Sequence, residues 1–158
     1  MPETQSKDSE TLIIAPLWRR LTSIVYDAFP LFALGMLYGG LTQLIDVALN
    51  GQGELNYDVK VQGLWFQLGF LGTILGFYIF FWLRAGQTVG MRAWGLVVKH
   101  SDAKPLTFTG ALLRAPLAAA GLLLAGIGYW WCLIDTRGDA LQDRLSKTRV
   151  FFIPKQKR

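Results

Sequence analysis

Charged residues are scarce in this chain and unevenly distributed. They make up 17% of its 158 residues, whereas apolar residues make up 52%. Asp46 is the only charge in residues 28–49, and residues 63–83 and 115–134 contain none. About 20 apolar residues in a helix cross roughly 30 Å of hydrocarbon. Three such stretches leave too little polar chain to shield them from water, so the sequence indicates an integral membrane protein.

Cysteine and histidine are almost absent as well. Cys132 is the only cysteine, which excludes an intrachain disulfide, and His100 is the only histidine, which argues against a histidine–cysteine metal cluster. The sequence has no phosphate-binding glycine loop and no serine placed beside a base. We therefore expect no enzymatic activity, no metal and no cofactor. We also expect no cleavable signal peptide, because the apolar run after Arg20 is too long for a signal core.

The apolar runs predict an all-α membrane protein with about three hydrophobic helical segments. We expect spans over about 20–49, 63–83 and 111–134, within a transmembrane domain of residues 18–153. A polar tail with an interfacial segment (1–17) precedes this domain, and a basic tail (154–158) follows it. Pro30 predicts a kink in the first span, and Pro116 with nearby glycines predicts that the third is broken or re-entrant.

Two smaller features lie in and between these spans. Residues 94–99 and 149–153 have strand character, which predicts a small β-like connection on the cytoplasmic side. Small residues at Gly35-x-x-x-Gly39 and Gly72-x-x-x-Gly76 let helix backbones approach closely. We expect this packing within the chain in preference to a dimer interface.

The positive charges predict the topology. Lysine and arginine number three before the first span, one between the first and second, five in residues 84–114 and seven after residue 134. The positive-inside rule then places the N-terminus and residues 84–114 in the cytoplasm and residues 50–62 outside. Three full crossings would export the last seven cations, whereas a re-entrant third run keeps them in the cytoplasm, which we favour. Because the cations flank apolar spans, we expect no nucleic-acid partner.

Three motifs occur in order around these spans: RRLTSIVYD at 19–27, GQTVGMRAWGLVV at 86–98 and LQDRLSKTRV at 141–150. Together they resemble the RDD family of small membrane proteins, named for an arginine and two aspartates. By position, the naming residues fall on Arg20, Asp27 and Asp143. The rest of the family pattern falls on Gly86, Thr88, Gly90, Gly95 and Thr148.

The resemblance covers residues 18–152 and implies transport of ions or small ligands, in some cases cation/proton exchange. Two positions depart from the family pattern. Met91 stands where a lysine is usual, and Gln142 stands where a histidine is usual. A proton-transfer role of that histidine is therefore not implied for this chain.

The spacing of Arg20 and Asp27 places both on one helix face, about 10 Å apart along the axis. This distance is too long for an easy salt bridge, so each is expected to find a partner elsewhere. For Arg20 that partner is Asp143. For Asp27 the candidates are Arg92 and Arg114, because a carboxylate in a membrane helix has to face protein or water.

Two interpretations of Asp27 remain open. In the functional one, Asp27 and the carbonyl of Tyr26, which Pro30 leaves without a hydrogen-bond donor, offer oxygens to a cation or a proton. In the structural one, which we favour, Asp27 pairs with an arginine and fixes helix packing.

The leading functional hypothesis is a multi-pass protein of a bacterial cytoplasmic (inner) membrane that contributes to transport of an ion or small solute. The lipid bilayer is its expected partner. A homo-oligomer or a partner membrane protein is expected as well, because three short segments enclose little volume. The alternative is a non-transporting scaffold or accessory subunit whose Arg/Asp pairs are structural.

Overall fold

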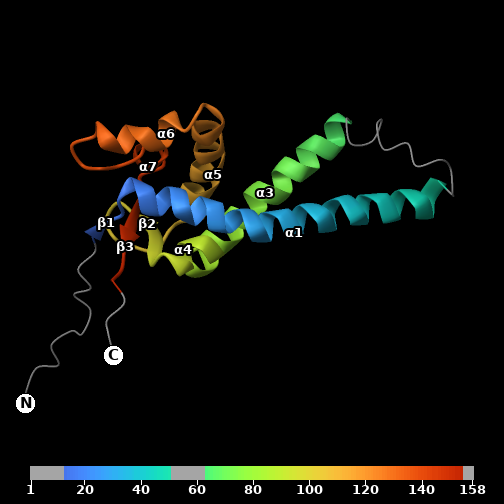
Figure 1. The fold of residues 1–158 in the computed structure, drawn as a ribbon, viewed down its shortest axis with the longest axis horizontal. Coiled ribbons are helices and arrows are strands. Elements are labelled where there is room, and N and C mark those ends of the chain that lie inside the picture. The colour runs from blue at the N-terminus through green and yellow to red at the C-terminus, as the bar shows by residue number, and fades with distance from the viewer. Residues whose placement is uncertain (1–12, 51–62, 155–158) are drawn as a thin grey trace, which may run out of the picture.

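The structure is a computed structural model that describes residues 13–50 and 63–154. Its elements are β1 (Ile13–Ile14), α1 (Leu17–Asn50), α3 (Leu64–Ala85), α4 (Val89–Ala93), β2 (Leu96–His100), α5 (Phe108–Leu123), α6 (Ile127–Trp130), the 3-10 turn η1 (Trp131–Leu133), α7 (Leu141–Leu145) and β3 (Thr148–Phe152). Figure 1 shows α1 running the length of the molecule and the shorter elements gathered at one end. The predicted polar connection at 51–62 and most of both tails lie outside the described residues.

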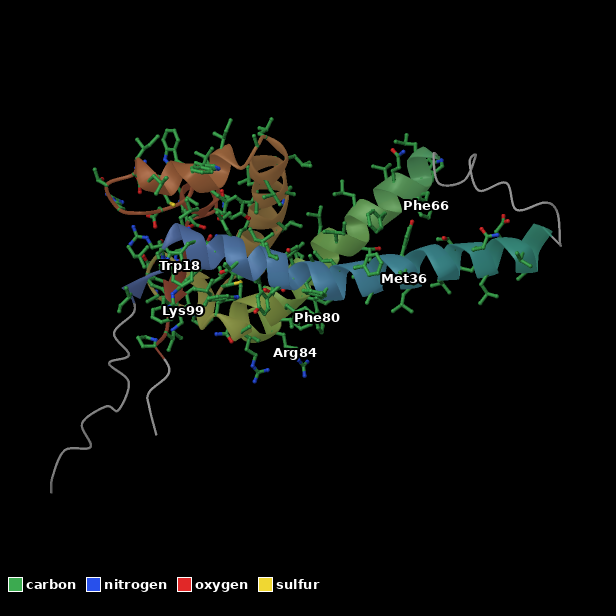
Figure 2. All side chains as sticks on the ribbon, in the orientation of Figure 1. Trp18, Met36, Phe66, Phe80, Arg84 and Lys99 are labelled. Carbon is green, nitrogen blue, oxygen red and sulfur yellow. The ribbon has the colours of Figure 1, made fainter. Side chains whose placement is uncertain are left out.

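Two helices, α1 and α3, are long and apolar enough to cross a membrane. Their apolar side chains project outward, as Figure 2 shows for Met36 and Phe80. Phe29 in α1 is 76% exposed and Trp65 in α3 is 84% exposed. Because removing apolar surface from water is strongly favourable, helices of this kind need lipid or another apolar partner around them.

The third apolar run is broken, as predicted. The axis of α5 and that of Ile127–Leu133 differ in direction by 105°, as in a broken span or a re-entrant loop. The break lies at Ala125 and Gly126, where φ is +54° and +77°. Pro116 does not cause the break, because α5 continues through it. In the same way, α1 continues as one helix through Pro30.

A three-stranded antiparallel sheet in the order β1-β3-β2 joins three distant parts of the chain. Val98 in β2 lies opposite Val150 in β3, and Ile14 in β1 lies opposite Phe151. The two predicted strands are confirmed, with bounds shifted by one or two residues. Within the predicted interfacial segment, Ile13–Ile14 pair with β3 as an edge strand. The position of that segment at the membrane interface stays a prediction.

Of the four glycines predicted to pack between α1 and α3, only Gly35 does so: a Cβ there would lie 3.2 Å from the ring of Phe70 in α3. Nothing lies within 4 Å of the position that a Cβ would take at Gly39, Gly72 or Gly76. The two helices meet through aromatic side chains instead. The Tyr38 hydroxyl donates to the carbonyl of Phe66 at 3.0 Å. The helices then diverge toward their far ends, as Figure 1 shows.

Candidate functional site

Asp143 in α7 is the centre of a buried ion-pair cluster. Arg20 of α1 donates from Nη1 to its Oδ2 at 2.5 Å, and Arg114 of α5 donates from Nη1 to its Oδ1 at 2.5 Å. None of the three side chains is more than 5% exposed. The predicted pairing of Arg20 with Asp143 is confirmed. One carboxylate therefore ties together the first and third apolar segments and the C-terminal part of the chain.

The two arginines use their nitrogens differently. Arg20 also donates from Nε to the carbonyl of Ala15 at 2.9 Å and from Nη2 to that of Gly138 at 3.3 Å, so all three nitrogens are engaged. Every hydrogen bond of Arg114 to a described residue comes from Nη1, which also reaches the Thr148 hydroxyl at 2.6 Å. Its buried Nε has no partner there.

The ionisation of Asp143 is set by two opposing effects. Complete burial raises the pKa of a carboxyl group because it penalises the charged form. The guanidiniums of Arg114 and Arg20 and the backbone N–H of Ala140 outweigh that penalty and hold the pKa of Asp143 below its usual value. The cluster is therefore built for a carboxylate, not for a proton exchanged near neutral pH.

Asp27 lies in a second buried cluster and receives hydrogen bonds from neutral donors. The Thr88 hydroxyl donates to its Oδ2 at 2.5 Å, and the Gly90 N–H donates to its Oδ1 at 2.7 Å. Thr88 is the N-cap of α4 and also accepts from the Met91 N–H at 3.2 Å. A short polar turn at the start of α4 thus satisfies both oxygens of a carboxylate that is 1% exposed.

The predicted pairing of Asp27 with Arg92 or Arg114 is wrong. Arg92 is exposed on α4, and Arg114 is held by Asp143. The ring of Tyr26 packs edge-on against that of Trp94, with centroids 5.7 Å apart. Among residues 13–50 and 63–154, no three His, Cys, Asp or Glu side chains are grouped to hold a metal ion. The cation or proton site at Asp27 and Tyr26 stays a prediction.

The motif glycines shape the segment that carries Thr88. Gly86 ends α3 with φ of +67°, a conformation that favours glycine, and its N–H donates to the carbonyl of Trp82 at 2.8 Å. Gly95, also at +67°, leads into β2. At Gly90 a Cβ would overlap the carbonyl oxygen of Ser23, so only glycine lets α4 lie this close to α1.

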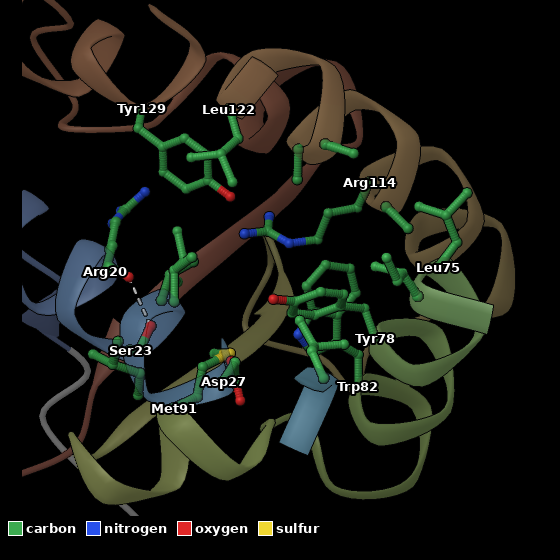
Figure 3. A pocket seen from close by; sticks show the side chains of 18 of the residues that line it. Arg20, Ser23, Asp27, Leu75, Tyr78, Trp82, Met91, Arg114, Leu122 and Tyr129 are labelled. Carbon is green, nitrogen blue, oxygen red and sulfur yellow. Dashed lines mark hydrogen bonds between the residues drawn. The ribbon is translucent and has the colours of Figure 1, made fainter. Parts of the chain in front are cut away.

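A cavity of about 240 Å³ lies beside both clusters, among α1, α3, α5 and α6. Figure 3 shows Arg114 reaching from α5 into the space between Arg20, Tyr78 and Tyr129. Much of the remaining lining is apolar. It comprises Ile24, Ala28, Leu31, Ile74, Leu75, Trp82, Met91, Leu96, Ala115, Ala118, Ala119, Leu122 and Val150, with Ser23 and Asp27 as further polar members.

The RDD family model matches residues 14–147, which is most of the chain. The chain belongs to the RDD family. No curated protein and no solved structure matches it. Family membership and the two exposed apolar helices together identify a membrane protein.

The RDD motif residues divide between the two buried clusters and the glycine turns that support them. The two departures from the RDD pattern are buried as well. Met91 lines the cavity. Gln142 is 1% exposed, and neither its Oε1 nor its Nε2 has a hydrogen-bond partner among the described residues. We have no physical account of that amide.

Sequence reasoning missed the cavity and its aromatic lining, Tyr78, Trp82 and Tyr129. These residues come from apolar runs without a motif. They meet only because the chain bends by 105° at Ala125 and Gly126, which sets α6 across the end of α5. No signal in a single sequence fixes the direction of that turn.

Proposed function

We propose that this RDD protein is a multi-pass protein of a bacterial cytoplasmic membrane that binds a small solute in the cavity and contributes to its transport. The observation that carries the proposal is the 240 Å³ cavity, which adjoins the two buried charge clusters. Ligand sites are typically concave and mostly apolar, with a few fixed polar groups. This lining suits a small, partly apolar solute better than a hydrated cation. The proposal contains no catalytic step.

The sheet supports a topology with both described ends in the cytoplasm. β1 precedes the first span, β2 follows the second, and β3 follows the broken third run, yet all three are hydrogen-bonded together. They therefore belong on one side of a membrane. That arrangement agrees with α1 and α3 as full crossings and with Phe108–Leu133 as a re-entrant segment. The cation-rich segments at both ends favour the cytoplasm for that side.

We further propose that the protein works as a homo-oligomer or with a partner membrane protein. The outer parts of α1 and α3 diverge, and their side chains are exposed on most sides. A continuous path across the bilayer needs further walls, because polar solutes do not cross hydrocarbon unaided. A second copy or a partner would supply them.

Flux measurements on purified protein in proteoliposomes test the transport proposal. The vesicles contain in turn a pH-sensitive dye, labelled sodium and labelled small organic solutes. Ala119→Leu fills the cavity, whereas Ala120→Leu changes an exposed neighbour outside the lining. We expect flux of at least one solute, lowered several-fold by Ala119→Leu and unchanged by Ala120→Leu. Equal flux in the Ala119→Leu and Ala120→Leu variants would contradict a path through the cavity.

The scaffold function remains the second candidate, and one observation favours it. All three nitrogens of Arg20 and both oxygens of Asp27 are engaged by protein groups, as expected of structural cross-links. If no solute moves in any vesicle and the protein purifies with one dominant membrane protein, the scaffold function is the correct one.

A further inference from the structure

We infer that the cavity is a binding site for a small neutral alcohol, with an apolar body of about six or seven carbons and one hydroxyl group that bonds to Tyr78 and Tyr129. The inference rests on the proposed function in using the same cavity, where it names the class of solute, but it concerns binding and not flux. Two observations carry it. The charges around the cavity are balanced, and two hydroxyl groups open into it without a partner among the described residues.

The balance of charges around the cavity argues against a charged ligand. Arg20 and Arg114 are the two cations of the lining, and the carboxylates of Asp143 and Asp27 match them in number. Asp143 bonds to both arginines, and both oxygens of Asp27 accept from groups at the start of α4. A charged ligand would lose its hydration in a mostly apolar space where no opposite charge is left for it, which is costly. A neutral ligand avoids that cost.

Tyr78 of α3 and Tyr129 of α6 supply the polar groups that a neutral ligand can use. Both residues line the cavity, and Figure 3 shows their hydroxyl ends turned into the space beside Arg114. Neither hydroxyl bonds to a described residue. Neither is sealed inside the wall, as Nε1 of Trp82 is. The two hydroxyls are therefore free to bond to a molecule in the cavity.

A hydroxyl group on the ligand matches this pair of tyrosines. A hydroxyl can accept a hydrogen bond from one phenol and donate its own hydrogen to the other. A purely apolar ligand would instead cover both phenol hydroxyls and leave them without partners, which costs free energy. The polar part of the site therefore favours an alcohol over a hydrocarbon.

The rest of the lining limits the body of the alcohol. Leu31, Leu75 and Leu122 make much of the wall apolar, and the rings of Tyr78 and Trp82 lie side by side with centroids 5.3 Å apart. Aromatic side chains of this kind pack well against another ring. An engineered apolar cavity of about 150 Å³ holds benzene. A cavity of about 240 Å³ therefore has room for a ring with a short arm that carries the hydroxyl, and benzyl alcohol is the probe of choice.

The test titrates 4-fluorobenzyl alcohol into the purified full-length protein in a nonionic detergent and follows the width of its fluorine NMR line. Partition into detergent broadens the line without saturating, whereas binding in the cavity saturates. We expect a saturable component with wild type and with Ala120→Leu, and its loss in Ala119→Leu, which fills the cavity. No saturable component in wild type, or equal ones in the two alanine variants, would overturn the inference.

Competition tests whether the ligand is neutral. Unlabelled benzyl alcohol should displace the fluorinated probe. Benzoate and benzylammonium keep the ring but carry a charge, and each should displace the probe about tenfold less well or worse. Displacement by either charged compound at the concentration that suffices for benzyl alcohol would overturn the inference.

Two variants and a matched control test the hydrogen bonds. Tyr78→Phe and Tyr129→Phe each remove one hydroxyl from the cavity and should weaken binding about fivefold, as expected for one lost hydrogen bond. Because neither hydroxyl bonds to a described residue, both variants should keep the fold. Tyr26→Phe removes a hydroxyl outside the lining and should leave binding unchanged. Equal binding in all three variants would overturn the assignment.

Binding and transport fail separately. Saturable binding of the alcohol without solute flux would leave this inference standing and contradict the proposed function. Solute flux that depends on the cavity, without saturable binding of the alcohol, would do the reverse.

Discussion

At the scale of single residues, two arginines around one aspartate have different roles. Arg20 is fully engaged and holds the fold together, while Arg114 bonds Asp143 and Thr148 through Nη1 alone and leaves its buried Nε without a partner among the described residues. A buried carboxylate between two guanidiniums avoids the cost of an unpaired buried charge. This explains why a chain with so few charges places three of them together inside.

Asp143→Asn should destabilise the protein by about 3–5 kcal/mol, because it leaves two buried guanidiniums without a carboxylate. The pKa of Asp143 is lowered in the folded state, so its stabilising contribution is full above the unfolded value of about 4 and is lost as pH falls through the folded value. Melting curves in detergent between pH 7 and pH 3 measure this. The gap between wild type and Asp143→Asn should be constant down to about pH 4 and narrow below it. A gap that narrows already between pH 7 and pH 5 would contradict the lowered pKa.

Gln142→Met should stabilise the protein by about 1 kcal/mol, because it replaces a buried amide that has no described partner with an apolar chain of similar length. For a protein of this size that is a rise of about 2–4 °C in melting temperature. A fall in melting temperature of the same size would show that the Gln142 amide is hydrogen-bonded in the folded protein.

Residue-level prediction from the sequence succeeded for one aspartate and failed for the other. Arg20 and Asp143 flank apolar runs and carry opposite charges, which was enough to pair them from the sequence. Asp27 is satisfied by a hydroxyl and a backbone N–H, which carry no charge and depend on the local turn of α4. Charge counting misassigned its partner for that reason.

At the scale of elements, α4 lies so close to α1 at Gly90 that the position has no room for a side chain. Gly90→Ala would drive a Cβ into the Ser23 carbonyl oxygen and against the Asp27 backbone, neither of which can rotate away. We expect a loss of about 1–3 kcal/mol or more. Gly72→Ala is the control, because its Cβ would meet nothing within 4 Å and alanine favours a helix. Thermal melts of the two variants should differ in sign. Equal effects would contradict the close α1–α4 packing.

Element positions were largely predictable, and their partners were not. Hydrophobic run length located α1 and α3, and strand character located β2 and β3. The two-residue strand β1 and the 105° turn after α5 depend on pairing and on the backbone at Ala125 and Gly126, which a one-dimensional pattern does not encode. Of the glycine pairs in α1 and α3, only Gly35 packs against the other helix, beneath the Phe70 ring, because aromatic side chains make most of that contact.

At the scale of the whole molecule, the fold has two parts of different character. One is a compact end, in which the sheet, the short helices and both buried clusters tie distant segments together. The other is a pair of long apolar helices that are exposed to their surroundings. The cavity lies in the compact end, so its contents would face the cytoplasmic side of the membrane in the proposed topology. In that topology α1 and α3 would anchor this end in the bilayer, and the bent third segment would cover it.

Single-cysteine labelling with a membrane-impermeant reagent, in a Cys132→Ser background, tests that arrangement. Ser101→Cys lies in the turn after β2 and Pro154→Cys follows β3, so both should label only after the cells are permeabilised. Gly51→Cys, just beyond the end of α1 and outside the described residues, should label in intact cells. The sheet requires the first two positions to behave alike, because β2 and β3 are hydrogen-bonded neighbours. Labelling of Pro154→Cys from outside while Ser101→Cys stays protected would place the two strands on opposite sides of the membrane. It would contradict the sheet, the re-entrant third segment and the cytoplasmic C-terminus together.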